Sequence, residues 1–92
     1  MHELSLLADL LRKIESVARL EQASAVTRVT VSIGALCHLS PSHLRDHFAR
    51  AVQGTIVEGA RLNIEVLTDV TDSHAQEILL ESVEVVARND SK

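Results

Sequence analysis

The sequence predicts an α/β (α+β) fold in which two helices pack on one face of a small three-stranded sheet. Two segments repeat apolar residues at the spacing of one helical face, and three others carry the alternating or apolar pattern of strands. These segments follow one another in the order helix, strand, helix, strand, strand. Neither the apolar helix faces nor the apolar side of the sheet can be left in water, so the prediction is a two-layer sandwich.

The first helix is predicted to begin near residue 4 and to fade around Gln22. Its apolar face consists of Leu7, Leu10, Leu11, Ile14, Val17 and Ala18. Residues 22–25 are expected to form a short connection. The segment 28–33 then alternates polar and apolar residues and is rich in β-branched side chains, which predicts a strand with one wet face and one buried face.

Ser40 and Pro41 are predicted to open the second helix. A serine just before a helix accepts a hydrogen bond from a free backbone N–H, and a proline at the first helical position loses nothing by lacking one. The apolar stripe of this helix is expected to consist of Leu44, Phe48, Ala51 and Val52. Gly54 is a suitable residue to follow its end.

The rest of the chain predicts a turn and two more strands. A turn is expected at 58–59, and residues 60–66 alternate as a second strand. After a polar stretch, a third strand is expected over about 77–87, with a bulge near Glu81 because the parity of the apolar residues changes there. We expect the second and third strands to pair as an antiparallel hairpin with a long loop.

Length and composition bound the class of protein. The 92 residues suit one domain, 1–92, with 46% hydrophobic residues and one aromatic residue, Phe48. The net charge is −4 and the basic residues are scattered, which argues against nucleic acid as a partner because phosphate neutralisation needs a concentrated basic face. No membrane helix is expected, and Glu3 and Asp9 occupy the place of a signal peptide's basic region. The single cysteine, Cys37, also suits the cytoplasm, where we expect the protein.

No arrangement of residues indicates an enzyme. Cys37 and His38 are adjacent, and adjacent side chains on a strand point to opposite faces, so we do not expect them to form a catalytic dyad. The glutamates show no spacing that singles out a catalytic pair. A Gly-rich phosphate loop is also missing from the sequence. We therefore expect neither catalysis nor nucleotide binding.

The first three residues, Met1, His2 and Glu3, form the candidate metal site. Initiator methionine is generally kept before a large residue, so we expect a free Met1 amine, whose ordinary pKa is about 7.7–8.0. Ni²⁺ or Cu²⁺ can deprotonate the amide between Met1 and His2 and bind amine, amide and imidazole nitrogens near one plane. Glu3 could add a further ligand. On spacing alone this signal is weak, because chain termini are usually loose.

Three further histidines, His43, His47 and His74, are considered as metal ligands. His43 and His47 are at positions i and i+4 of the second predicted helix, which places them on one face. We interpret this face as solvated, with metal binding as the alternative. His74 lies in the polar stretch before the third strand, where Asp69 and Asp72 could add oxygen ligands. We interpret this stretch as a polar loop and leave the ligand role open.

Four blocks of sequence resemble the HypA/HybF family of nickel metallochaperones. They are, in order, MHELSLLADLLRKIE, RVTVSIGALCHLSPSHL, QGTIVEGARLNIEV and ILLESVEVV. They resemble the family's Met-His-Glu opening with its helix, its first strand and Pro-started second helix, its Gly-Thr to Ile-Glu segment, and the strand that closes its nickel domain. The resemblance covers most of the chain. It implies that nickel(II) is bound mainly by His2, with the Met1 amine and Glu3 beside it.

The chain departs from the family where a zinc domain is expected. The family places that domain between the second and third strands and holds its zinc with two Cys-x-x-Cys pairs. Here the place is filled by a loop at about 68–76, and the sequence has no Cys-x-x-Cys. A structural zinc site needs about four Cys or His ligands on paired spacings. We therefore expect no structural zinc.

The resemblance implies a nickel-binding metallochaperone, or assembly factor, for the maturation of [NiFe]-hydrogenase. By the same analogy its partners are a nickel-loading maturation GTPase and the hydrogenase large subunit. The alternative is a metal-free protein-interaction module that docks on these partners. The free edges of a small sheet also leave a homo-oligomer open.

Overall fold

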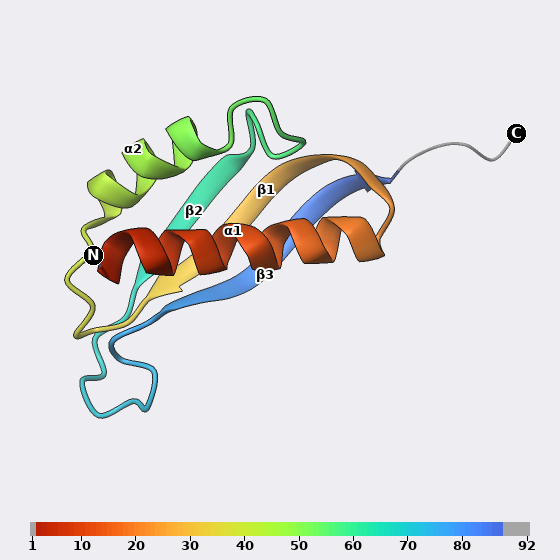
Figure 1. Cartoon of the computed structure of the whole chain (residues 1–92). Helices are drawn as coiled ribbons and strands as arrows, with labels where there is room; N and C mark the ends of the chain where they lie inside the picture. Colours follow the sequence, from red (N-terminus) through yellow and green to blue (C-terminus); the bar gives the residue numbers. More distant parts are fainter. Residues whose placement is uncertain (1, 88–92) are drawn as a thin grey trace, which may run out of the picture.

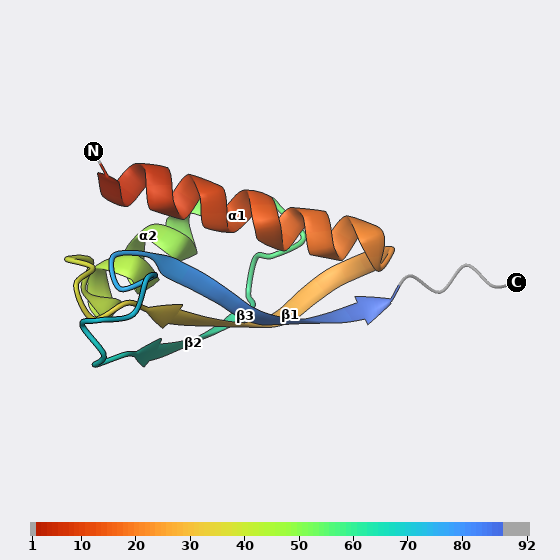
Figure 2. The same ribbon diagram turned by 90° about the horizontal axis from the view of Figure 1, so that it is seen from below.

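The computed structural model describes residues 2–87, with side-chain environments from residue 5 onward. Its elements are α1 (His2–Leu20), β1 (Ala23–Ile33), α2 (Pro41–Ala51), β2 (Arg61–Val66) and β3 (Ile78–Ala87) (Figure 1). Both helices lie on the same face of the sheet (Figure 2). The predicted order of elements and the two-layer arrangement are therefore confirmed.

α1 is amphipathic and turns one apolar stripe toward the sheet. The buried residues of this stripe are Leu7, Leu10, Ile14 and Ala18. They belong to the face that the helical spacing predicts. The helix begins at His2, about two residues earlier than predicted, and ends at Leu20.

A tight turn joins α1 to β1, and the short connection predicted over 22–25 is wrong because β1 already begins at Ala23. Gln22 has a φ of 54°, in the left-handed region, so the chain reverses within two residues. Ala23 then pairs with Ala87 of β3, and both Ala23 and Val26 are buried. Register shifts against β3 interrupt this first half of β1, which hides it from a simple period-two pattern.

β1 occupies the centre of the sheet, in the order β2-β1-β3. It pairs in parallel with β2 and antiparallel with β3, so the predicted hairpin between the second and third strands is wrong. The physical reason is that β1 is apolar enough to lie between two neighbours, since Val29, Val31 and Ile33 are at most 2% exposed. α2 carries the chain across the sheet so that β2 joins one edge of β1, which leaves the other edge for β3.

β3 contains the predicted bulge. Its residues 80–82 face only two residues of β1, Val31 and Thr30, so Glu81 is the extra one. Val83 beyond the bulge still packs against the same core as the apolar residues before it. The bulge therefore reconciles the two parities of apolar residues in this strand.

Ser40 caps α2 as predicted. Its Oγ accepts a hydrogen bond from the backbone N–H of His43 at 3.2 Å, and Pro41 opens the helix. The helix ends at Ala51, which is exposed rather than part of the buried stripe, and Gly54 follows in the next turn with a φ of 81°. The residues of the predicted stripe that are buried are Leu44, Phe48 and Val52.

The core lies between the two helices and the sheet. Besides the residues named above, it includes the buried side chains of Leu39, Val57, Leu62 and Ile78. Neither helix in the described part of the chain has the length and apolarity needed to cross a membrane.

Candidate metal centre

One end of the molecule brings together the start of α1 and two loops. β1 and β2 are parallel and β3 runs the other way, so the ends of β1 and β2 and the start of β3 share one edge of the sheet. The tight turn at Gln22 sends β1 back along α1, which brings the start of α1 to the same edge (Figures 1 and 2). We call this region, formed by the start of α1 and residues 34–40 and 67–77, the loop end.

Two of the three predicted metal ligands, His2 and Glu3, open α1 at the loop end. Their side chains, and the whole of Met1, lie outside the described residues. The backbone N–H groups of the first four residues of a helix have no acceptor within that helix. The amide nitrogen of His2, which a planar metal site would use, is therefore not committed to a hydrogen bond of α1.

A cavity of about 300 Å³ lies beside the second turn of α1. Its lining residues are Ser5, Leu6, Leu36, Cys37, His38, Leu39 and Gln76. Cys37 is half-buried and His38 is exposed. Both lie in an irregular segment after β1, so our argument that they occupy opposite faces of a strand is wrong. Cys37 and His38 both line the cavity, to which they bring a thiol and an imidazole.

The loop 67–77 is fastened to the turn that follows β1. The N–H of Gly34 donates to the carbonyl of Glu77 at 2.8 Å, and the N–H of Leu36 donates to the carbonyl of Ala75 at 2.7 Å. A Cβ atom on Gly34 would lie 2.2 Å from the carbonyl oxygen of Ala75, which no real contact allows. Only glycine permits this approach, so the two loops of the loop end hold each other in a defined shape.

The acidic residues of this loop shape its turns. The carboxylate of Asp69 accepts hydrogen bonds from the hydroxyl of Thr71 at 2.6 Å and from its N–H at 2.9 Å. These two bonds, the hydroxyl's first, lower the pKa of Asp69 below its ordinary value of 3.8. Asp72 accepts from the N–H of His74 at 2.7 Å, and Nδ1 of His74 lies 3.1 Å from Oε1 of Glu77. These contacts favour the polar-loop interpretation over oxygen donors grouped around a metal.

Metal-binding side chains do not gather in larger groups where the structure can be described. Over residues 5–87, no cluster of three or more His, Cys, Asp or Glu side chains is arranged to hold a metal ion. His43 and His47 form a pair on α2, with ring centroids 6.4 Å apart and planes tilted by 59°. His43 is exposed and His47 half-buried, which agrees with the predicted solvated face.

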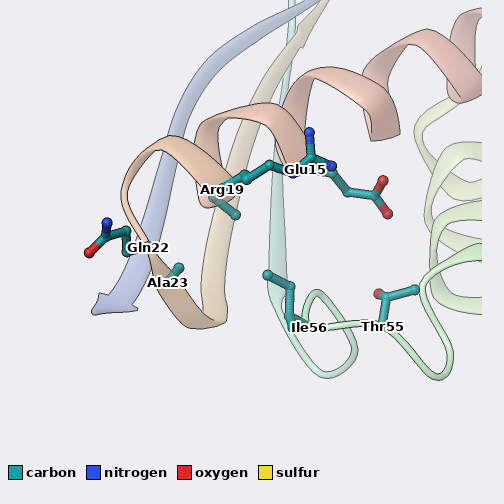
Figure 3. Close-up of a pocket in the computed structure, with 7 residues that line it drawn as sticks. Glu15, Arg19, Gln22, Ala23, Thr55 and Ile56 are labelled. Atoms are coloured by element: carbon teal, nitrogen blue, oxygen red, sulfur yellow. The ribbon is translucent and has the colours of Figure 1, made fainter. Parts of the chain in front are cut away.

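A second cavity, of about 570 Å³, lies at the opposite end of α1 (Figure 3). Glu15 and Arg19 of α1 form one side of it, and Thr55 and Ile56 from the segment after α2 form the other. No pattern in the sequence pointed to these residues as a site. The turn at Gln22, whose φ is 54°, lies beside the cavity.

Comparison with known families identifies the chain. The sequence model described as "Hydrogenase/urease nickel incorporation, metallochaperone, hypA" matches residues 1–75, which is most of the chain. The chain belongs to the HypA family. The matched part of this HypA-family chain contains His2, Glu3 and the segment 34–40, whereas β3 follows it.

Several curated relatives named hydrogenase maturation factor HypA are similar in sequence. That of Chlorobium limicola is 39% identical over 70 residues, which cover 76% of this chain and 60% of the relative. That of Acidithiobacillus ferrooxidans is 44% identical over 64 residues, which cover 70% and 57%. HypA 1 of Bradyrhizobium diazoefficiens is 33% identical over 90 residues, which cover 98% and 77%. The chain thus spans about three fifths of the length of the first two relatives.

One solved HypA structure has the same fold. It is the solution structure of the Ni metallochaperone HypA from Helicobacter pylori, which superposes with a TM-score of 0.77 and is 20% identical. The superposition covers 91% of this chain and 97% of that one. At this level of identity, the likeness to the Helicobacter protein shows the HypA fold alone.

Proposed function

We propose that this HypA-family chain captures Ni²⁺ with its first three residues and delivers it during hydrogenase maturation. The observation that carries the proposal is the match to the nickel-incorporation family from residue 1, which includes Met1, His2 and Glu3. The ligands would be the Met1 amine, the His2 amide and imidazole nitrogens, and a Glu3 oxygen or nitrogen. The protein then acts as a carrier and not as a catalyst.

The start of α1 suits such a site for a chemical reason. Ni²⁺ can displace the proton of a backbone amide when the amine before it and the imidazole after it close small chelate rings, and the three nitrogens then lie near one plane. The His2 amide is free of helical hydrogen bonds because it belongs to the first turn of α1. The negative charge of the amide, together with the Glu3 carboxylate, offsets the unfavourable approach of a cation to a helix N-terminus.

The proposal that the chain delivers nickel rests on the family to which it belongs. The relatives are named hydrogenase maturation factors, so the partners we propose are a nickel-loading maturation GTPase and the hydrogenase large subunit, in the cytoplasm. The loop 67–77 would stand where the family carries a zinc domain, so this chain would hold nickel without structural zinc.

The test is a titration of Ni²⁺ into tag-free protein that keeps the Met1 amine. Calorimetry measures affinity, and absorption spectroscopy follows the planar, amide-bound nickel. We expect His2→Ala and a short N-terminal extension each to abolish the planar species, and His74→Ala to leave it unchanged. Capture releases protons from the amine and the imidazole, so affinity should fall as the pH is lowered from 8 to about 5.5.

The proposal is overturned if the planar nickel species does not depend on the N-terminal residues. If the wild-type, His2→Ala and extended proteins all lack the planar nickel species, the chain does not use its first residues as ligands. A metal-free module that docks on the maturation partners would then be the better reading. Binding of the purified GTPase by wild type and His2→Ala with equal affinity, and without nickel, would support that alternative.

A further inference from the structure

α2 presents two imidazoles one helical turn apart. His43 is exposed and His47 half-buried, and their ring centroids are 6.4 Å apart. We propose that His43 and His47 together bind one divalent metal ion of borderline character, such as nickel, copper or zinc. The ligands of this second site are other residues than those of the proposed N-terminal one.

The helix holds the two residues in a fixed relation. Residues four apart on a helix have Cβ atoms about 5–6 Å apart on the same face. α2 itself is held in place in two ways. Ser40 caps its start, and Leu44 and Phe48 are buried in the core, 0% and 3% exposed. Because the buried pair determines the rotation of the helix, His43 and His47 stay toward solvent.

The separation of the rings is close to what a shared ion requires. A metal–imidazole bond is about 2.0–2.1 Å long, so two rings on one ion have their coordinating nitrogens within about 4 Å of each other. The ring centroids are 6.4 Å apart, so the rings must come closer together to share one ion. Rotation about the side-chain bonds of the exposed His43 closes this gap without moving the helix backbone.

The surrounding charges are nearly balanced. Nε of Arg50 donates to the backbone carbonyl of Asp46 at 3.4 Å, so this cation stays on the same side of α2 as the histidines. Asp46 is exposed and lies three residues after His43, and residues three apart on a helix share a face, so it adds a negative charge near the pair. Arg45, by contrast, donates to the carbonyl of Leu62 at 2.6 Å and is directed toward β2. One acidic and one basic residue, Asp46 and Arg50, therefore lie within one helical turn of the pair.

The ligand chemistry selects the class of metal and the kind of site. Neutral imidazole suits nickel, copper and zinc, whereas magnesium and calcium require oxygen ligands. Within residues 5–87 no third His, Cys, Asp or Glu side chain joins the pair in a metal-binding group. The bound ion therefore keeps positions open for water or an outside ligand, and it exchanges more readily than an ion in a closed site.

The experiment uses a full chain in which the proposed N-terminal site is blocked by His2→Ala and a short N-terminal extension. Ni²⁺ is titrated into this protein by calorimetry, and proton NMR follows the imidazole signals. We expect one nickel to bind and to broaden the signals of both His43 and His47. His43→Gln and His47→Gln, each added to the blocked protein, should weaken binding at least tenfold.

Two controls keep the outcome interpretable. His74→Gln in the blocked protein removes an exposed histidine of another loop and should leave affinity unchanged, and Mg²⁺ should not compete. Neither histidine is buried in the core, so the substitutions should leave the fold intact, which circular dichroism checks. The proposal is overturned if the blocked protein binds no nickel, or if either glutamine variant binds it as well as its parent. Such a failure leaves the N-terminal proposal untouched, because that proposal is tested by His2-dependent binding in the unblocked chain.

Discussion

Gly34→Ala tests how closely the two loops of the loop end approach each other. An alanine Cβ at this position would lie 2.2 Å from the carbonyl oxygen of Ala75 and 2.6 Å from that of His74. Both neighbours are backbone atoms, so no side chain can swing away. The φ of Gly34 is not in the left-handed region, and the substitution therefore probes space and not backbone conformation.

The expected loss of stability follows from the contacts. The two segments must separate by about 1 Å to accept the methyl group, and overpacking of this kind costs about 1–3 kcal/mol. The separation also stretches the hydrogen bonds from Gly34 to Glu77 and from Leu36 to Ala75, now 2.8 and 2.7 Å long. Each contributes about 1 kcal/mol net. Since the two effects overlap, we expect Gly34→Ala to lower the free energy of unfolding by about 2–4 kcal/mol.

Urea denaturation measures this loss, and Gly59→Ala is the matched control. A Cβ on Gly59 meets nothing within 4 Å, but its φ of 85° makes alanine strained by about 1–2 kcal/mol. We expect the denaturation midpoint to fall further for Gly34→Ala than for Gly59→Ala. A smaller fall for Gly34→Ala than for Gly59→Ala would refute the close approach of residues 34 and 75.

Three further predictions concern α2 and the loop 67–77. Ser40→Ala removes the acceptor of the His43 N–H, and should lower the free energy of unfolding by about 1 kcal/mol in thermal denaturation. Phe48→Ala should cost about 3–5 kcal/mol by urea denaturation, because the ring is buried in an aliphatic core. Thr71→Val should raise the pKa of Asp69 toward 3.8 in a carboxylate NMR titration, since the hydroxyl is the main cause of the lowered value. The pKa of Asp69 is lower in the folded state, so its hydrogen bonds with Thr71 stabilise the fold fully above pH 3.8. This contribution is lost as the pH falls through the lowered pKa.

The local features of the fold follow from local patterns. The apolar face of α1, the Ser40–Pro41 start of α2 and the bulge at Glu81 all agree with the sequence analysis. Each depends on residues within one or two turns of helix or a few residues of strand. The exception is the join between α1 and β1, where Gln22 takes a conformation that residues other than glycine seldom adopt.

The candidate metal site, too, was predicted from the sequence only in part. Met1, His2 and Glu3 were predicted from their order in the chain and from resemblance, and their role as ligands stays a prediction. Sequence reasoning did not reveal that residues 34–40 and 67–77 converge on the start of α1. It also placed Cys37 and His38 on a strand, although they line a cavity beside that helix.

The sequence by itself determined the order and kind of the helices and strands, most of the buried faces and the family that the chain resembles, but not the first half of β1. The periods of apolar residues and the capping residues act over short distances, so they can be read without knowing the partners of each segment. Only the tertiary structure decided that β1 is central and that β2 and β3 occupy its two edges. Which strands pair depends on the free energy of the whole fold and not on one segment. The close approach of Gly34 to Ala75 is found only in the strand order that forms.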